Sequence, residues 1–404
     1  MAQVLGVSRT SERRSGARVA LAHDYLAARG GAERFLIAVM DLYPEATIYT
    51  SLFEPDLTFP NFASRRVISS PLNLARPLRR HYRSALPLLP WAFGHLEVDA
   101  DVVVCTTSGW SHGIVTDVPK IAYCHTPARW LYQRDDYTRG MKSFWLAATV
   151  SKPLLQGWDR RAAASCDRYL ASSRAIAERV RRTYGIEAEV LPPPTSLDVT
   201  ASREPVEGIG EGFFLSVGRL LGYKHVDALL AAFDELGPGF RLVVAGDGPL
   251  RTELHSRAGA NVTFLGEVND AQLRWLYANC TALLSAADED FGLTPIEAGL
   301  FGKPCGVIRK NGFIDTTIPG ETGLFFEELR PRHIADAVRQ IERASWDAEA
   351  IALSADRFSA AGFRRRLDTI IEETVGRPPT QLTFPGELSG PSPQATTTGA
   401  AING

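Results

Sequence analysis

Short apolar runs alternate with amphipathic segments along this chain, and the whole alternation occurs twice. Each apolar run has the length of a buried strand and is followed by a segment whose apolar residues recur at helical spacing. Such alternation is typical of βαβ units, in which helices cover both faces of a parallel sheet. A chain of 404 residues is also too long for one ordinary core. We therefore predict two α/β domains.

A stretch that breaks regular structure separates the two halves. Residues 196–212 are rich in Gly, Ser, Pro and charged residues, which predicts an interdomain linker. We accordingly expect a first domain over residues 17–195 and a second over residues 213–356. The polar residues 1–16 predict a flexible extension. Residues 376–404, rich in Pro, Gly, Ser and Thr with almost no charge, predict a disordered tail.

The composition argues against several classes of protein. A hydrophobic content of 45% and a charged content of 22% are normal for a soluble globular protein. The net charge of −2 provides no basic field for nucleic acid, and no apolar run reaches the roughly 20 residues of a membrane span. The first residues lack the apolar core of a secretory signal, and the five scattered cysteines show no metal-ligand or redox spacing. We expect a cytoplasmic protein.

Two carboxylates, Glu289 and Glu297, lie eight residues apart around a glycine turn. The apolar run 281–285 before them predicts a strand, and residues 295–302 after them predict a short helix with a proline in its first turn. Glu289 is then at the carboxyl end of a strand, and the backbone N–H groups of residues 291–294 lie at a helix start that attracts anions. Glu297, in the first helical turn, is placed to accept hydrogen bonds from a diol. The alternative is that Glu297 only complements the helix dipole and Glu289 is solvated.

A second loop of the same half carries positive charge. Gly218, Arg219 and Lys224 lie where a predicted strand gives way to a helix, a position suited to clamping a diphosphate. In the first half, Gly30 and Gly31 open a predicted helix, where backbone N–H groups can approach a phosphate or an anionic acceptor. A simple tight turn is the alternative. Because no first strand is followed by G-x-G-x-x-G, a dinucleotide-dependent dehydrogenase is disfavoured.

His125 directly follows a predicted buried strand over residues 120–124 and precedes a Thr-Pro turn. Open α/β sheets bind their ligands at the carboxyl ends of strands. His125 is therefore a candidate site residue, although a lone histidine in this position is more often structural.

Residues 57–96 contain no acidic side chain but several arginines, interleaved with leucines and aromatic residues. The arginines are Arg65, Arg66, Arg76, Arg79, Arg80 and Arg83. This mixture suggests in-plane contact with an anionic membrane or a lipid-phosphate acceptor. A basic solvated helix with an apolar core-facing stripe is the alternative.

Four sets of residues together resemble one family, the retaining glycosyltransferases of family 4: Glu289-x7-Glu297, Gly218-Arg219 with Lys224, Gly246-Asp247-Gly248-Pro249, and Gly30-Gly31. Residues 123–130 are similar to the WbaZ-like branch, which includes mannosyltransferases of O-antigen and exopolysaccharide assembly. The resemblance covers roughly residues 18–374. It implies the GT-B fold, in which two Rossmann-like domains face each other across a central cleft. It also implies that the last helix, within residues 357–375, crosses back to the first domain.

The resemblance also implies roles for individual residues. Arg219 and Lys224 would neutralise the donor diphosphate. Glu289 would hold hydroxyls of the transferred sugar, Glu297 would hold the ribose, and His125 would face the reacting sugar. The further donor-binding positions implied are Gly30, Gly31, Gly218, Val268, Phe291, Gly292 and Leu293. No metal or other cofactor is implied, since an Arg/Lys pair can stabilise the departing diphosphate.

The resulting hypothesis is an enzyme that transfers a hexose from a nucleotide sugar to a lipid-linked or polysaccharide acceptor. The best candidate is mannose from GDP-mannose, and a UDP-sugar donor is the alternative within the same fold. A non-catalytic nucleotide-sugar-binding subunit also remains open. The two glutamates are not expected to act as a glycosidase acid and nucleophile, because a ribose-binding Glu297 lies too far from the anomeric carbon.

Overall fold

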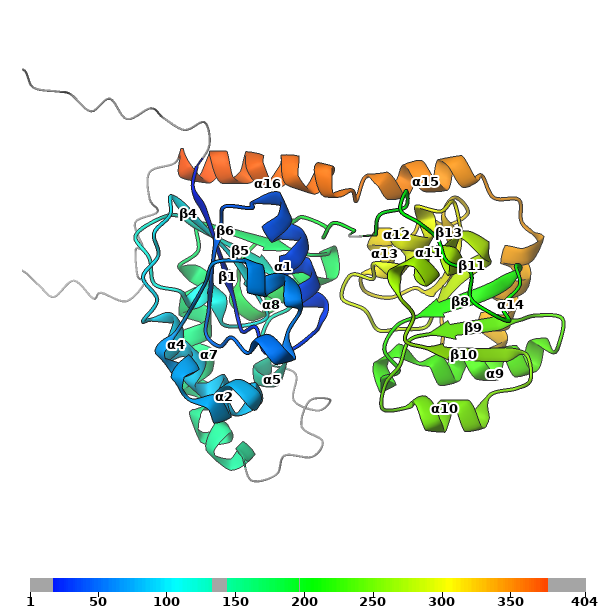
Figure 1. Ribbon diagram of the computed structural model, residues 1–404, viewed down its shortest axis with the longest axis horizontal. Helices are drawn as coiled ribbons and strands as arrows, with labels where there is room; N and C mark the ends of the chain where they lie inside the picture. The colour runs from blue at the N-terminus through cyan, green and yellow to red at the C-terminus, as the bar shows by residue number, and fades with distance from the viewer. Residues whose placement is uncertain (1–16, 133–143, 196, 377–404) are drawn as a thin grey trace, which may run out of the picture.

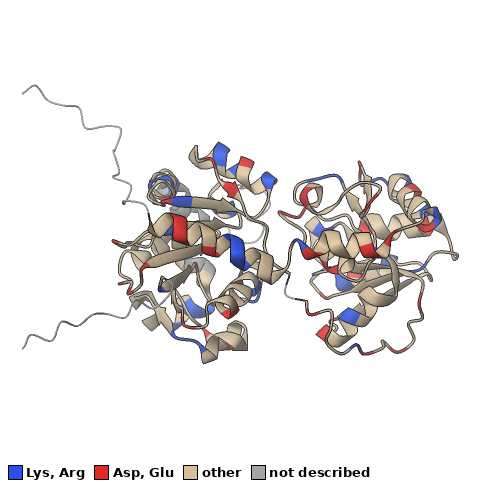
Figure 2. Ribbon diagram, turned by 90° about the horizontal axis from the view of Figure 1, so that it is seen from above, with Lys and Arg blue, Asp and Glu red and all other residues tan. Residues whose placement is uncertain are grey.

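The computed structural model describes residues 17–132, 144–195 and 197–376. Figure 1 shows two lobes, each built around its own sheet, with the described part of the chain ending in a helix over the first lobe. The predicted flexible extension 1–16 lies outside the described residues, as does the predicted tail apart from Gly376. Seen from above in Figure 2, the acidic and basic residues marked on the ribbon are spread over both lobes, in keeping with the small net charge.

The first lobe contains a parallel sheet of seven strands in the order β3-β2-β1-β4-β5-β6-β7. Its strands are β1 Val19–His23, β2 Thr47–Thr50, β3 Val67–Ser69, β4 Val102–Thr107, β5 Lys120–Cys124, β6 Arg168–Ala171 and β7 Glu189–Val190. The strand order reverses direction at β1, which pairs with both β2 and β4. Doubly wound sheets bind ligands beside this point, at the carboxyl ends of the strands.

The second lobe contains a parallel sheet of six strands in the order β10-β9-β8-β11-β12-β13. Its strands are β8 Phe213–Val217, β9 Leu242–Ala245, β10 Val262–Gly266, β11 Cys280–Ser285, β12 Cys305–Ile308 and β13 Gly323–Phe326. The reversal falls at β8, which pairs with β9 and β11. The loop that contains Glu289 leaves the carboxyl end of β11, beside this reversal.

Helices cover both sheets. In the first lobe they are α1 Gly31–Leu42, α2 Arg76–Arg80, α3 Tyr82–Ala85, α4 Leu89–Phe93, α5 Arg129–Tyr132, α7 Phe144–Ala164 and α8 Arg174–Tyr184. In the second they are α9 Val226–Leu236, α10 Arg251–Arg257, α11 Asp270–Asn279, α12 Thr294–Gly299, α13 Phe313–Thr316, α14 Pro331–Arg343 and α15 Ala348–Asp356, and the described chain closes with α16 Ala360–Val375.

Alternate residues of β1 point into different cores. Leu21 joins the cluster that contains Phe35 and Leu36 of α1, whereas Ala20 and Ala22 join the cluster on the opposite face, with α4 and α7. This alternation is the expected result of the two-residue period of a strand. Because helices cover both faces of the sheet, the central strands are buried on both sides and consist mainly of β-branched and aliphatic residues.

The last helix crosses back to the first lobe. Phe363, Leu367 and Ile370 of α16 are buried in the same core cluster as α1 and β1. Figure 1 shows α16 lying along the first lobe and α15 along the second. Where the chain passes between the lobes for the first time, the backbone N–H of Thr195 donates to the carbonyl of Phe358, 3.1 Å away. The two connections between the lobes are thus joined by a hydrogen bond.

One expectation about the helices is wrong. The sequence suggested a single helix from Pro331 to about residue 355, but the structure has two, α14 and α15. The second begins at Asp347, whose carboxylate accepts hydrogen bonds from the backbone N–H groups of Glu349 and Ala350. An aspartate at this position caps a new helix start and satisfies N–H groups that have no partner inside the helix.

Candidate active site

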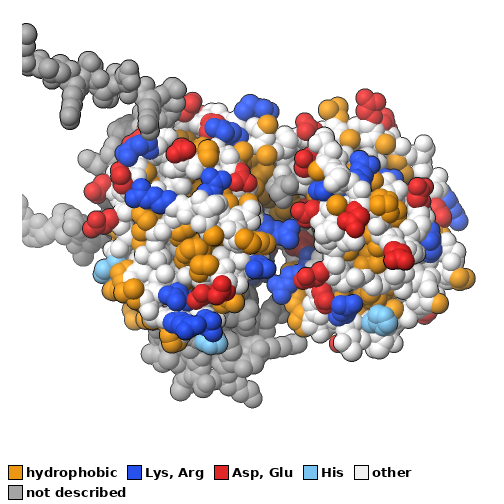
Figure 3. Space-filling model, viewed as in Figure 1, with side chains coloured by type: hydrophobic (Ala, Val, Ile, Leu, Met, Phe, Trp, Pro, Cys, Tyr) orange, Lys and Arg blue, Asp and Glu red, His pale blue; other side chains and the backbone are white. Residues whose placement is uncertain are grey.

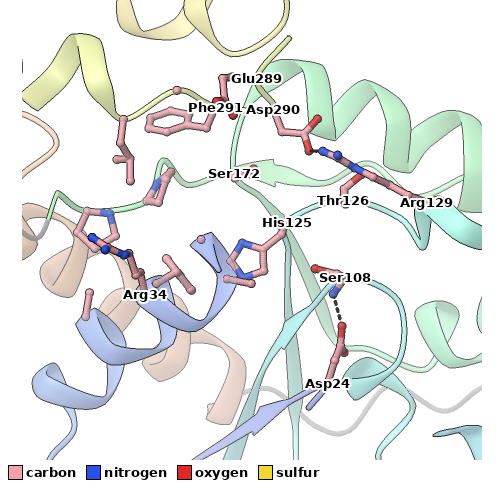
Figure 4. Close-up of a pocket in the computed structure, with 18 of the residues that line it drawn as sticks. Asp24, Arg34, Ser108, His125, Thr126, Arg129, Ser172, Glu289, Asp290 and Phe291 are labelled. Carbon is pink, nitrogen blue, oxygen red and sulfur yellow. Dashed lines mark hydrogen bonds and ion pairs between the residues drawn. The ribbon is translucent and has the colours of Figure 1, made fainter. Parts of the chain in front are cut away.

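A cavity of about 500 Å³ lies between the two lobes. It is bordered by the loop after β11 and the start of α12 on one side, and by the start of α1 and the loops after β1, β4 and β5 on the other. Both sheets therefore present their strand ends to it, as expected for ligand sites of open α/β sheets. Figure 3 shows basic side chains gathered at the opening between the lobes, and Figure 4 shows the lining residues.

Lys224 and Glu289 form an ion pair in this cavity. Their side chains are only 17% and 24% exposed, so water screens the pair less than at an open surface. The backbone of Glu289 is held as well, because its carbonyl accepts a 3.1 Å hydrogen bond from the Gly312 N–H. The two predicted residues therefore meet, with one positive and one negative group available to a ligand.

Glu297 lies in the first turn of α12 and also lines the cavity. The Tyr277 hydroxyl donates a 2.7 Å hydrogen bond to its carboxylate, which leaves the other carboxylate oxygen available to a diol. Burial raises the pKa of Glu297, and the Tyr277 hydrogen bond and the nearby Arg34 oppose that rise. The ribose contact of Glu297 stays a prediction.

The loop between the two glutamates is packed tightly. Phe291 is buried against Phe358, with ring centroids 5.9 Å apart. Gly292 has φ +84°, and a Cβ added there would lie 2.4 Å from the Phe313 ring. Only glycine fits this turn without strain. Phe291, Gly292 and Leu293 all line the cavity, and their contact with a donor stays a prediction.

His125 lies on the opposite wall, directly after β5. Its ring packs edge-on against Phe35, with centroids 4.9 Å apart, and its Nε2 atom is buried without a hydrogen-bond partner in the described structure. Burial, together with the smaller effect of the nearby His23, lowers the pKa of His125 to about 3. The imidazole is therefore neutral near pH 7, with one polar atom left to meet a ligand.

This burial makes the stability of the fold depend on pH. Between about pH 6.5, the usual pKa of histidine, and about 3, the unfolded chain binds a proton that folded His125 does not. Stability should therefore fall as pH decreases through this window, by up to about 1.4 kcal/mol per pH unit from this residue. We expect His125→Phe to remove that component. Urea unfolding of both proteins between pH 7 and 4 tests this, and parallel pH curves would contradict it.

The start of α1 completes the first-domain wall. Gly31 lines the cavity, and a Cβ added there would meet no atom within 4 Å, so it borders open space. Gly30 is the N-cap of α1 and does not line the cavity. Arg34, one turn further along α1, does line it, as Figure 4 shows. Of the two glycines predicted to approach a ligand, only Gly31 therefore lines the cavity.

Sequence reasoning missed Asp24, which follows β1 and lines the cavity. Its buried carboxylate accepts hydrogen bonds from the backbone N–H groups of Ser108 at 2.6 Å, Ser111 at 2.7 Å and Trp110 at 3.2 Å. Asp24 therefore shapes the loop after β4, on the floor of the cavity. No local pattern could identify it, because Ser108 is 84 residues away in sequence.

Sequence reasoning also missed a cross-domain cluster beside Glu289. Asp290 pairs with Arg129 of α5 and with Arg179 of α8, so both arginines come from the first domain. Figure 4 shows Arg129 reaching toward Asp290. Arg129 and Arg179 are 161 and 111 residues away from Asp290 in sequence, so no local motif could indicate the cluster.

Three further predicted residues do not border the cavity. Arg219 is exposed, and Val268 packs against the core of the second domain. Gly218, at φ +151°, lies against Lys224, since a Cβ added there would be 3.1 Å from the lysine Nζ. Gly218 thus makes room for the lysine, while the proposed roles of Arg219 and Val268 stay predictions.

Within the described ranges, no helix is both long and apolar enough to cross a bilayer, and no three His, Cys, Asp or Glu side chains are grouped as metal ligands.

Two family models match the chain. Residues 201–357 match the model of glycosyl transferases group 1, and residues 29–199 match that of Glycosyltransferase Family 4. The chain belongs to the family 4 glycosyltransferases. The acidic loop and the Lys224 loop of this glycosyltransferase fall in the first match, and His125 and Gly31 fall in the second. The cavity is therefore built from both matched regions.

The curated relatives of this protein include enzymes named as sugar transferases. It is 32% identical to the D-rhamnosyltransferase WbpZ of Pseudomonas aeruginosa over 50% of this chain and 55% of WbpZ. It is 36% identical to the GDP-mannose-dependent alpha-(1-6)-phosphatidylinositol dimannoside mannosyltransferase of Mycobacterium tuberculosis, over 31% of this chain and 34% of the relative. The matches span about half of the first relative and a third of the second.

Solved structures share its fold. The HepE protein of Anabaena, solved with UDP and glucose, has a TM-score of 0.64 at 16% identity and covers 88% of this chain and 99% of its own. The lipopolysaccharide outer core galactosyltransferase WaaB has a TM-score of 0.63 at 17% identity, with the same coverage. These similarities confirm the predicted GT-B fold.

Proposed function

We propose that this protein is a retaining hexosyltransferase that moves mannose from GDP-mannose to a lipid-linked or polysaccharide acceptor. The observation that carries the proposal is the Lys224–Glu289 ion pair in a cavity whose opposite wall contains His125 and Gly31. The names of two relatives support mannose as the sugar: the Mycobacterium tuberculosis enzyme above, and the O-antigen chain mannosyltransferase C of Escherichia coli, 30% identical over 162 residues.

The donor side of the cavity suits a nucleoside diphosphate sugar. When the bond to the anomeric carbon breaks, negative charge develops on the departing diphosphate. Lys224, held in the cavity and little exposed, supplies the compensating charge. Glu289, freed from part of its ion pair, accepts hydrogen bonds from sugar hydroxyls. Glu297, whose carboxylate accepts a hydrogen bond from the Tyr277 hydroxyl, accepts those of the ribose. No metal ion is required in this scheme.

Retention of configuration follows from attack of the acceptor on the same face from which the diphosphate leaves. The departing phosphate oxygen then accepts the acceptor proton, so no protein base is needed at that step. His125 fits such a scheme as a neutral group, because a pKa of about 3 keeps its imidazole from acting as a general acid at neutral pH. Its buried Nε2 atom can instead receive or give one hydrogen bond to a sugar hydroxyl.

A donor panel tests this function. The purified protein is incubated with GDP-mannose, UDP-glucose, UDP-galactose or UDP-N-acetylglucosamine, and release of the nucleoside diphosphate is measured with and without a lipid-linked saccharide. Turnover of GDP-mannose alone supports the proposal. Turnover of a UDP-sugar alone would show that the donor is a UDP-sugar and not GDP-mannose. Tight binding of a nucleotide sugar without turnover would indicate a non-catalytic binding subunit.

We also propose that the first domain touches an anionic membrane through the segment 57–96. Its exposed apolar side chains include Leu74 at 88% and Trp91 at 48% exposure. The arginines contribute less than their number suggested, because Arg79 pairs with Glu54 and Arg65 pairs with Asp41. Exposed arginines at 66, 76 and 80 remain for lipid phosphates.

Vesicle flotation tests this contact. The protein is expected to float with vesicles that contain anionic lipid and to remain below with neutral ones. Leu74→Ser combined with Trp91→Ser should reduce the floating fraction severalfold, since both side chains lose their apolar contact. The matched control is Leu353→Ser, a change at a leucine that is 75% exposed in α15 of the other domain. Equal flotation with both vesicle types would exclude the electrostatic contact.

A further inference from the structure

The ion cluster around Asp290 joins the two domains at the edge of the cavity. One carboxylate oxygen of Asp290 pairs with Arg179 at 2.8 Å, and the other pairs with Arg129. The Asp290 carbonyl accepts a 2.6 Å hydrogen bond from the hydroxyl of Ser173, the N-cap of α8. Three side chains of the first domain thus hold one residue of the second.

These contacts are partly sheltered from water. The side chain of Asp290 is 19% exposed, that of Arg179 is 25% exposed and that of Arg129 is 39% exposed. Arg179 is further fixed by a 3.1 Å hydrogen bond to the Thr126 hydroxyl, next to His125. Charge pairs at this depth are stronger than exposed ones, and the loss of one partner leaves the other charges poorly solvated.

Asp290 itself lines the cavity. It directly follows Glu289 and precedes Phe291, so its neighbours on both sides line the cavity. A second contact supports the same arrangement, because Arg174 at the start of α8 pairs with Asp315 of the second domain, a carboxylate only 9% exposed. The acidic loop is therefore anchored to α5 and α8 of the other domain.

We propose that Asp290 is a positioning residue. Its two ion pairs with Arg129 and Arg179, together called the clasp, couple closure of the two domains to the placement of Glu289. With the clasp formed, the acidic loop is held at the distance from His125 and α1 at which both walls meet one ligand. With the clasp broken, the domains separate, and the acidic loop is no longer held at this distance from His125 and α1. The coupling to catalysis rests on the proposed function, but the clasp itself does not.

The test compares Asp290→Asn with Asp288→Asn. Asp288 lies two residues earlier in the same loop, but its partners Lys310 and Asn311 belong to its own domain. Small-angle X-ray scattering measures the radius of gyration, and steady-state kinetics with the donor found active give kcat and KM. Circular dichroism melting shows that each variant is folded.

We expect Asp290→Asn to increase the radius of gyration and to lower kcat about tenfold while donor KM changes little, because the donor contacts of the second domain remain. Arg179→Gln, on the other domain, should do the same, and the double variant should be no worse than either single one. Asp290→Glu should restore much of both properties, and Asp288→Asn should change neither.

The other outcomes distinguish failure of the clasp, failure of its coupling to catalysis and failure of the proposed function. A fall in kcat without a change in the radius of gyration would overturn the clasp and make Asp290 a substrate contact. An increased radius with unchanged kcat would overturn the coupling. If the wild-type protein turns over no nucleotide sugar, the proposed function fails, and the scattering comparison alone still decides whether the clasp holds the domains together.

Discussion

Replacing Lys224 by methionine is expected to lower kcat by about 10²- to 10³-fold, the usual cost of removing one preorganised group that stabilises developing charge. Lys224 pairs with Glu289 in the cavity and is 17% exposed. Methionine keeps the length of the side chain but removes the charge, so the departing diphosphate is left without this partner. The measurement is steady-state turnover of the donor that the panel identifies.

A second lysine near the same loop provides the control. Lys310 pairs with Asp288 and is 53% exposed, so it lies beside the acidic loop but faces solvent. Lys310→Met should therefore retain activity within about twofold, as expected for an exposed ion pair. If the two variants were equally active, Lys224 would not be the group that neutralises the diphosphate. If both lost activity to the same extent, the effect would come from disturbing the loop and not from the charge.

Gly312→Ala is expected to have a comparable effect by displacing the acidic loop. A Cβ at Gly312 would lie 2.1 Å from the Phe291 Cα and 2.2 Å from its carbonyl oxygen. Backbone atoms cannot rotate away, so the loop must move, and the hydrogen bond from Gly312 to Glu289 must lengthen or break. We expect a loss of about 1–3 kcal/mol in stability and about 10²-fold in turnover, because misplacement by about 1 Å is that costly in an active site.

Thermal unfolding and donor turnover measure the two parts of this prediction. Gly239→Ala is the matched control, because Gly239 is exposed between α9 and β9 and an added Cβ there meets nothing within 4 Å. It should leave both quantities close to wild type. Full activity in Gly312→Ala would mean that the loop tolerates the shift, and its backbone would then have no part in donor placement.

The central strands could be predicted because they are long, apolar and flanked by helical patterns. The expected strands at 120–124 and 281–285 coincide with β5 and, within one residue, with β11, and both lie inside their sheets. The edge strands β3 and β7 were missed, and they have three and two residues. A short edge strand pairs on one side only and buries little, so its sequence carries a weak signal.

The two α/β domains, the acidic loop with its two glutamates and the lysine on the neighbouring loop could all be predicted from the residues alone. These features depend on local periodicity, on residue type and on the place of a loop at the end of a strand, all of which are encoded in short windows. The family resemblance added the expectation that the last helix crosses back, and the burial of Phe363 and Leu367 beside β1 agrees with it.

Which of these groups meet depends on how the chain folds in three dimensions. The tertiary structure brought Lys224 against Glu289, placed Arg219 outside the cavity lining, and added Asp24 and the clasp of Asp290 with Arg129 and Arg179. The physical reason is that ion pairs and hydrogen bonds depend on distance in space. A partner 111 or 161 residues away leaves no trace in the residues around Asp290.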